Sequence, residues 1–349
     1  MNTADLAFAP RHDLGIRTVS VSAPGRLHLG FLDPSGSLGR AFGSLGLVID
    51  GFTTELELSA SPSEADQLAA DTPAAETELP RAAAHVAALR QRSGCHAPLS
   101  LRLCQVLPPH AGFGSGTQLA SAIGRAFAEW HGLDVGTATL AHWLGRGLRS
   151  GIGIAGFDTG GLLLDGGPAA DGLPAPLLSR IAFPEDWRII VVQDPGHRGL
   201  SGGAEKQAIA ALPPLPQSVA ADICHQVLMR VLPGAASEEF APFAAGINRM
   251  QQLLGEHFAP AQGGVFTSLA VARLMRWFAD ASRANGAAIG QSSWGPTGFA
   301  IVPSETRAQL LVDAARAGGH VDPALEIRIV TGRNRGAVVR DRSVPPRAR

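Results

Sequence analysis

The segment "PPHAGFGSGTQLASAIGRAFAEWHG", residues 108–132, carries the clearest chemical signal in the chain. Three glycines, Gly112, Gly114 and Gly116, lead into apolar residues that recur at helical spacing. Glycines let a backbone approach a ligand closely, and the first free N–H groups of a helix attract an anion. Since Ser115 and Thr117 add hydroxyl groups, we expect this glycine loop to bind a phosphate or a pyrophosphate.

The glycine loop matches neither of the two common nucleotide-binding motifs. No lysine follows its last glycine, as a Walker A element requires, and no G-x-G-x-x-G pattern with a suitably placed acidic residue is present. Taken alone, the loop could be a turn that serves only close packing. However, two more glycine-punctuated segments accompany it, "SAPGRLHLGF" at 22–31 and "GQSSWGPTGFAIV" at 290–302.

These three segments, in this order, resemble the three motifs of the GHMP kinase superfamily. Residues 23–26 match its Pro-Gly-Arg turn, residues 108–116 its second, phosphate-binding motif, and residues 292–298 its late glycine-rich turn. Two departures argue against ATP as substrate. The glycine loop continues with Thr117 rather than Ser-Ser-Ala, and Trp294 stands in the third motif where the kinases carry mostly glycine.

Further segments narrow the resemblance. With "RLHLGFLD", "GRAFGSLGLVIDG" and "GRGLRSGIGIAGFDTGG", the chain resembles the β-ribofuranosylaminobenzene 5′-phosphate synthases, the branch of the superfamily that begins methanopterin biosynthesis. The resemblance implies a decarboxylating phosphoribosyltransferase. Its substrates would be phosphoribosyl pyrophosphate and either 4-hydroxybenzoate or 4-aminobenzoate, with CO2 and pyrophosphate released. An ATP-dependent small-molecule kinase and a non-catalytic ligand sensor on the same fold remain as alternatives.

The same resemblance implies an α+β fold, a mixture of helices and sheets. An N-terminal half like ribosomal protein S5 would cover residues 1–185 and carry the glycine loop, and a ferredoxin-like C-terminal half would cover 186–349. The local patterns predict several short strands over 16–59, an exposed loop over 61–78, and a helix from Pro80 that Gly94 ends. They also predict helices at 140–150, 217–232, 239–258, 267–284 and 306–317, and a frayed tail from 340.

Phosphoribosyl pyrophosphate would require two anion sites and a magnesium ion held by oxygen ligands. By analogy with the superfamily, the glycine loop would hold the pyrophosphate, with Ser115 or Thr117 near the metal. Arg26, Arg149 and Arg198 are candidates for the 5′-phosphate, because a guanidinium group matches phosphate oxygens in pairs. Each of these arginines alone could also be an ordinary surface residue.

Asp158, His28 and again Arg26 are candidates for catalysis, and Asp158 also for the metal. Asp158 falls where the kinases place a catalytic aspartate, so it could contact the metal, the acceptor or the ribosyl cation; a helix cap or a turn is the alternative. Strand alternation puts Arg26 and His28 on one face, so both could face one cleft. His28 could bind an anion or act as an acid or base, or it could be a structural histidine.

The aromatic acceptor needs a flat apolar partner. Trp294, next to Ser293 in a loop, could stack on the acceptor ring, and Phe31 or Phe157 could form a wall. We therefore expect Trp294, Ser293 and Phe31 to bind the acceptor.

Composition excludes several other classes of protein. The 349 residues are 45% hydrophobic, and a net charge of −1 with a pI near 6.8 does not favour nucleic-acid binding. Three cysteines without CxxC spacing suggest neither disulfides nor zinc. No run of about 18 apolar residues is present, and the start lacks a signal-peptide pattern. We expect a cytoplasmic enzyme with no membrane partner and no organic cofactor, and the family resemblance implies a homodimer.

Overall fold

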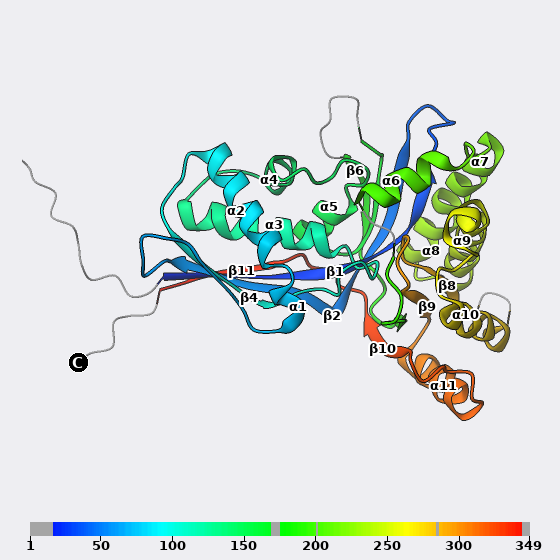
Figure 1. Cartoon of the computed structure of the whole chain (residues 1–349). Helices are drawn as coiled ribbons and strands as arrows, with labels where there is room; N and C mark the ends of the chain where they lie inside the picture. The colour runs from blue at the N-terminus through cyan, green and yellow to red at the C-terminus, as the bar shows by residue number, and fades with distance from the viewer. Residues whose placement is uncertain (1–16, 169–174, 200–201, 284–285, 344–349) are drawn as a thin grey trace, which may run out of the picture.

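A computed structural model describes residues 17–168, 175–199, 202–283 and 286–343, which form two sheets and their helices (Figure 1). The strands of the first sheet are β1 (Arg17–Asp33), β2 (Phe42–Ala60), β3 (Gln67–Ala70), β4 (Leu99–Gln105), β5 (Leu162–Asp165), β6 (Leu177–Ile181) and β11 (Val338–Ser343). Its main strand order is β11-β1-β2-β4-β3, and β5 pairs with β2 and β6. The second sheet has the order β10-β7-β9-β8, from β7 (Arg188–Gln193), β8 (Ala288–Gln291), β9 (Gly298–Val302) and β10 (Glu326–Thr331).

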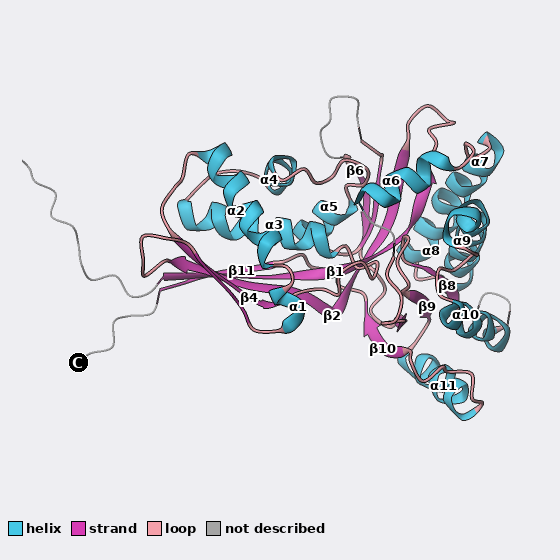
Figure 2. Ribbon diagram, in the orientation of Figure 1, coloured by secondary structure: helices cyan, strands magenta, loops and turns pink. Residues whose placement is uncertain are grey.

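The helices pack against these sheets in two groups, as Figure 2 shows. In the first half they are α1 (Pro73–Glu76), α2 (Leu79–Ser93), α3 (Ser115–His131), α4 (Thr137–Trp143) and α5 (Ile152–Thr159). In the second half they are α6 (Gly202–Ala211), α7 (Gln217–Gln226), the π-helix η1 (Val227–Val231), α8 (Leu232–Ala236), α9 (Phe240–Gln262), α10 (Leu269–Ser282) and α11 (Glu305–Ala317). This mixture confirms the predicted α+β fold.

Three apolar cores hold these layers together. One lies between α2, α3 and the first sheet, and another between α10, α11 and the second sheet. The largest joins the far ends of β1 and β2 to α7, α9 and the second sheet. Because this core spans both sheets, the glycine loop at the start of α3 is held against segments from the second half of the chain.

The prediction of several short strands over 16–59 is wrong, because this region forms one hairpin of two long strands. Pro24 and Gly30 lie at irregularities in the β1–β2 pairing, between Pro24 and Arg26 and between His28 and Gly30. Such bulges bend a strand without ending it. They fall at the residues that the motif analysis had selected.

The loop predicted over 61–78 contains β3 and α1, the latter capped by Thr72, whose hydroxyl accepts a hydrogen bond from the amide of Ala75 at 3.2 Å. The tail is also ordered further than predicted, since β11 pairs with β1 from Arg17 and Ser343 inward. β11 therefore belongs to the first sheet although it lies inside the range expected for the second half.

The region 140–150 differs from the prediction as well. α4 ends at Trp143, and Gly145 and Gly147 adopt φ values of 66° and 84° that a helix cannot continue through. A separate helix, α5, then covers the glycine-rich stretch that was not predicted to be helical. The helix from Leu79 to Ser93, ended by Gly94 at φ 74°, confirms the prediction for that segment. Among the described residues, no helix is long and apolar enough to cross a membrane.

Candidate active site

A cavity of about 450 Å³ lies where the glycine loop meets the first and third motifs. Four arginines line it: Arg26, Arg81, Arg146 and Arg149. The lining also includes the glycine loop from Gly112 to Thr117, and no aspartate or glutamate among the described residues belongs to it. The cavity is therefore strongly positive in a protein whose net charge is close to zero, which suits a ligand with several negative charges.

The glycine loop presents its backbone to this cavity. Gly112 and Gly114 adopt φ values of 97° and 75°, and the carbonyl of Gly114 accepts from Thr117 at 3.0 Å as α3 begins. The first amides of a helix, here those of Ser115 and Gly116, have no acceptor within the helix. A side chain at Gly114 would meet Arg26, whose Cζ lies 2.9 Å from the position of a Cβ atom. Glycine therefore lets Arg26 pack directly on the loop.

One buried hydroxyl connects all three motifs. Ser292 is fully buried, and its Oγ donates to the carbonyl of Gly112 at 2.7 Å and accepts from the amide of His28 at 2.9 Å. The amide of Ser293 donates to the carbonyl of His28 at 3.1 Å, and the amide of Arg26 to that of Phe113 at 3.1 Å. Residues far apart in the sequence are thus fixed around one cavity.

The imidazole ring of His28 lies in this region without a hydrogen-bond partner among the described residues. It is 4% exposed, and neither ring nitrogen has a hydrogen-bond partner within the described part of the chain. Burial, followed by the charges of Arg26 and Arg149, lowers the pKa of His28 to about 3. The ring is therefore neutral at pH 7, with one donor and one acceptor that a ligand could satisfy. Arg26 and His28 do line the same cavity, as strand alternation predicts.

The stability of the protein at acid pH should depend on the burial of His28 and of a second histidine, His85. His28 and His85, whose pKa values are lowered to about 3 and about 4, bind protons in the unfolded chain below pH 6.5 but not in the folded chain until lower pH. The free energy of unfolding should therefore fall as the pH falls from 6.5 toward 4, by up to about 1.4 kcal/mol per pH unit for each histidine. Urea unfolding at pH 7, 6 and 5 should show a shallower fall in His28→Gln than in the wild type or in the exposed control His96→Gln. Equal slopes for all three proteins would contradict the burial of a neutral imidazole.

The arginines predicted to bind the 5′-phosphate lie in different places. Arg26 and Arg149 line the cavity, whereas Arg198 is exposed and lines neither this cavity nor a smaller one beside it. The sequence analysis missed Arg81 and Arg146. Two signals could have found them: Arg81 follows the proline that starts a helix, and Arg146 lies between two glycines, three residues before Arg149.

Asp158 does not lie in the cavity. It sits near the C-terminal end of α5, and its carboxylate accepts from the hydroxyl of Thr137 at 2.6 Å, which itself accepts from Arg125 at 2.8 Å. The N-terminal end of α5 is the one that approaches the cavity, because a Cβ atom on Gly153 would lie 3.1 Å from Nε of Arg26. The geometry thus favours a structural role for Asp158, as the partner of Thr137, over contact with the metal or the acceptor.

Phe31 and Trp294 form a wall of the cavity, and Trp294 is buried rather than lying in an exposed loop. Trp294 is only 2% exposed and packs on Phe258 with 4.8 Å between ring centroids, while its indole N–H has no partner among the described residues. Phe31 contacts the ring of His28 at 4.5 Å. Both line the large cavity together with Ser293. Phe157 lies in the core against α3 instead, so the prediction that it could form the wall is wrong.

The smaller cavity, of about 30 Å³, adjoins this wall. It shares His28, Phe31, Ser293 and Trp294 with the large cavity and adds apolar side chains of α9, including Leu254. The charged cavity and the apolar one therefore meet at the same four residues, so that an aromatic acid could lie across this boundary.

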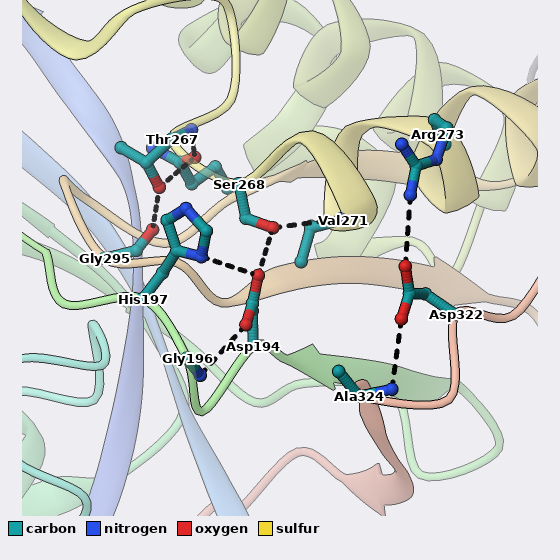
Figure 3. Close-up of polar contacts among 11 residues, drawn as sticks. Asp194, Gly196, His197, Thr267, Ser268, Val271, Arg273, Gly295, Asp322 and Ala324 are labelled. Carbon is teal, nitrogen blue, oxygen red and sulfur yellow. Dashed lines mark hydrogen bonds and ion pairs between the residues drawn. The ribbon is translucent and has the colours of Figure 1, made fainter.

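Polar contacts in the second half hold the third motif in place (Figure 3). The hydroxyl of Thr267 donates to the carbonyl of Gly295 at 3.2 Å. Directly beside it, Asp194 accepts from the hydroxyl of Ser268 at 2.5 Å and pairs with His197 at 2.9 Å. The turn that carries Arg198 is thus fixed by His197, while Arg198 itself lies on the surface.

No cluster of three or more histidines, cysteines or carboxylates in the described residues could hold a metal ion. Among the described residues that line the cavity, the side-chain oxygens are all hydroxyls, those of Ser115 and Thr117 among them. Asp158 does not fit the role of a metal ligand in this arrangement, because its carboxylate is directed to Thr137.

Comparison with known proteins places this geometry in a family. The family model of the GHMP kinases N-terminal domain matches residues 79–161, and that of the GHMP kinases C-terminal domain matches residues 231–321. A β-ribofuranosylphenol 5′-phosphate synthase from Archaeoglobus fulgidus is 32% identical over 80% of this chain and 87% of its own length. The chain belongs to the β-ribofuranosylphenol 5′-phosphate synthase family. The member from Methanothermobacter thermautotrophicus is 29% identical over 91% of this chain and 97% of its own.

Solved structures agree on the fold of this synthase family. A homoserine kinase from Cytophaga hutchinsonii superimposes with a TM-score of 0.65 at 17% identity, covering 96% of this chain and all of its own. A mevalonate diphosphate decarboxylase from Staphylococcus aureus gives 0.65 at 15% identity, covering 93% and 98%. These likenesses confirm the GHMP kinase fold.

Proposed function

We propose that the protein is a decarboxylating phosphoribosyltransferase that joins the ribosyl 5-phosphate of phosphoribosyl pyrophosphate to a para-substituted benzoate, as an early step of methanopterin biosynthesis. The observation that carries this proposal is a cavity lined by four arginines and, within the described residues, by no carboxylate, with an aromatic wall on one side. The arginines suit a ligand that carries both a phosphate and a pyrophosphate. The wall of Phe31 and Trp294 suits a ring beside it.

The relatives favour one acceptor. They are ribofuranosylphenol 5′-phosphate synthases, and a phenol product corresponds to 4-hydroxybenzoate as the acceptor. We therefore propose 4-hydroxybenzoate ahead of 4-aminobenzoate. A kinase is disfavoured by the altered loop and by the position of Asp158, which lies away from the cavity.

The chemistry requires a leaving group that departs with an electron pair. When the bond between the anomeric carbon and pyrophosphate breaks, Arg26, Arg149 and the free amides at the start of α3 would stabilise the developing charge. The ring carbon that bears the carboxylate then bonds to the anomeric carbon, using a pair of ring electrons. Loss of CO2 returns the pair of its broken bond to the ring, so the aromatic system is restored without any proton transfer.

The neutral imidazole of His28 fits this sequence as a ligand-binding group. Its ring nitrogens, which have no hydrogen-bond partner among the described residues, lie at the boundary of the two cavities, next to Phe31 and Trp294. The indole N–H of Trp294 likewise has no partner in the part of the chain that the structure describes. We propose that these two residues, with Ser293, orient the carboxylate end of the acceptor toward the ribose.

We further propose that Mg²⁺ accompanies the pyrophosphate, since magnesium ions are commonly bound through substrate phosphates. Ser115 and Thr117 would supply the nearest protein oxygens, and no step above depends on the ion. We also propose a cytoplasmic location, from the composition and the cysteine spacing, and a homodimer, from the family resemblance alone.

The test is a turnover assay with purified protein, phosphoribosyl pyrophosphate, Mg²⁺ and 4-hydroxybenzoate. Equimolar pyrophosphate and CO2 in the absence of ATP would support the proposal, and parallel reactions with 4-aminobenzoate would rank the acceptors. ADP formation from ATP and an alcohol, with neither product released from phosphoribosyl pyrophosphate, would favour the kinase instead.

A further inference from the structure

The four arginines of the large cavity fall into two pairs. Arg26 and Arg149 act together on His28, since their charges are those that lower its pKa after burial itself. Arg81 and Arg146 act together on His85 in the same way. The structure therefore holds two separate positive centres in one cavity, each with a buried neutral histidine beside it.

One arginine of each pair approaches a different glycine at the start of α3. A Cβ atom on Gly114 would lie 3.0 Å from Nη1 of Arg26, and one on Gly116 would lie 3.5 Å from Nη1 of Arg146. Gly114, at φ 75°, precedes the helix, and Gly116 lies in its first turn. The loop thus presents one glycine to an arginine of each pair.

The second pair is built to receive an anion. His85 is 7% exposed with Nε2 unpartnered, and Nε of Arg146 is also buried without a hydrogen-bond partner in the described chain. Glu78 pairs with Arg81 at 2.8 Å, and its charge acts on Arg146 less strongly than the charge of Arg81 does. Burial, and then the charge of Arg81, lowers the pKa of Arg146, so a bound anion would relieve the strain of two close cations.

We infer that Arg81 and Arg146 form a second anion site, which takes the 5′-phosphate of the donor, while Arg26 and Arg149 take the pyrophosphate. The assignment rests on the proposed function and follows from the aromatic wall. The acceptor must reach the anomeric carbon, and the wall contacts His28, on which the charges of Arg26 and Arg149 act. The pyrophosphate is attached to that same carbon. The 5′-phosphate is on the other end of the ribose, and we assign it to the second pair.

Two ligands separate the two sites: ribose 5-phosphate carries only the monophosphate, and inorganic pyrophosphate only the leaving group. In calorimetric titrations, Arg146→Gln should raise the Kd of ribose 5-phosphate by about 10- to 100-fold, the loss of a charged hydrogen bond, and that of pyrophosphate by less than about 3-fold. Arg149→Gln should show the reverse pattern.

A second, milder variant shows whether a loss of affinity results from misfolding. Arg81→Lys keeps a cation beside buried Glu78 but loses the paired donors of the guanidinium, so it should also weaken ribose 5-phosphate selectively. Arg92→Gln, an exposed arginine in the last turn of the same helix, is the matched control and should change neither affinity.

The outcomes are distinct for the two proposals. Equal weakening of both ligands by Arg146→Gln, or no binding of ribose 5-phosphate to the wild type, would overturn the second site. The crossed pattern in a protein that releases neither pyrophosphate nor CO2 would uphold the second site and refute the proposed reaction.

Discussion

Replacing Arg26 with glutamine is expected to lower kcat/KM for phosphoribosyl pyrophosphate by about 100- to 1000-fold, the usual effect of removing a donor that stabilises charge in a transition state. Arg26 packs on Gly114 and lines the cavity beside His28, so glutamine would remove a positive charge directly beside the glycine loop. Steady-state kinetics of pyrophosphate release would measure the loss. Most of it should appear in kcat, because the charge on the leaving group develops after binding.

The matched control for this prediction is Arg40→Gln, since Arg40 is exposed in the turn between β1 and β2. It removes the same charge from the protein and should keep wild-type kinetics. If Arg26→Gln retained more than about a third of the wild-type kcat/KM with an unchanged melting temperature, Arg26 would have no part in the chemistry.

Substituting Gly112 by alanine should destabilise the fold and inactivate the protein together. Gly112 adopts φ 97°, and its new Cβ atom would lie 2.5 Å from the backbone carbonyl oxygen of Ser292. Backbone strain and overlap each contribute about 1–3 kcal/mol, so we expect the free energy of unfolding to fall by roughly 2–5 kcal/mol. Chemical denaturation would measure it, and activity should be lost because the hydrogen bond from Ser292 fixes the loop.

Gly132 provides the control that separates strain from overlap. It caps the other end of α3 at φ 63°, but nothing lies within 4 Å of its added Cβ atom. Gly132→Ala should therefore lose only about 1–2 kcal/mol and keep its activity. Similar losses in the two variants would mean that the contact with Ser292 is not tight in solution.

The site was predictable from sequence where a motif fixes local backbone geometry. The glycine loop, its helix and the pairing of Arg26 with His28 on one face all follow from residues within a few positions of each other. Arg81 and Arg146 were missed, since each reaches the cavity from a different helix or loop and local sequence does not show that the two meet there. Their position depends on how α2 and α4 pack against α3.

Asp158 is a different case. The resemblance to the kinases made it a candidate for catalysis, but "IGIAGFDT" forms α5, and the direction of each side chain on a helix depends on the rotation between residues. The carboxylate therefore points to Thr137, while Gly153, about one and a half turns earlier, points to the cavity. Trp294 was placed in the right region, but its burial against Phe258 depends on α9, far away in sequence.

The pairing of β1 with β11 has a consequence for the nascent chain. β1 can pair with β2 as soon as residues 17–60 have left the ribosome. The other edge of β1 stays unpaired until residues 338–343 emerge, because it pairs with β11, Arg17 opposite Ser343. An open edge is a template for pairing with another chain, and a contact between residues so far apart closes slowly. During synthesis this edge of β1 can therefore pair with another chain until the last strand emerges.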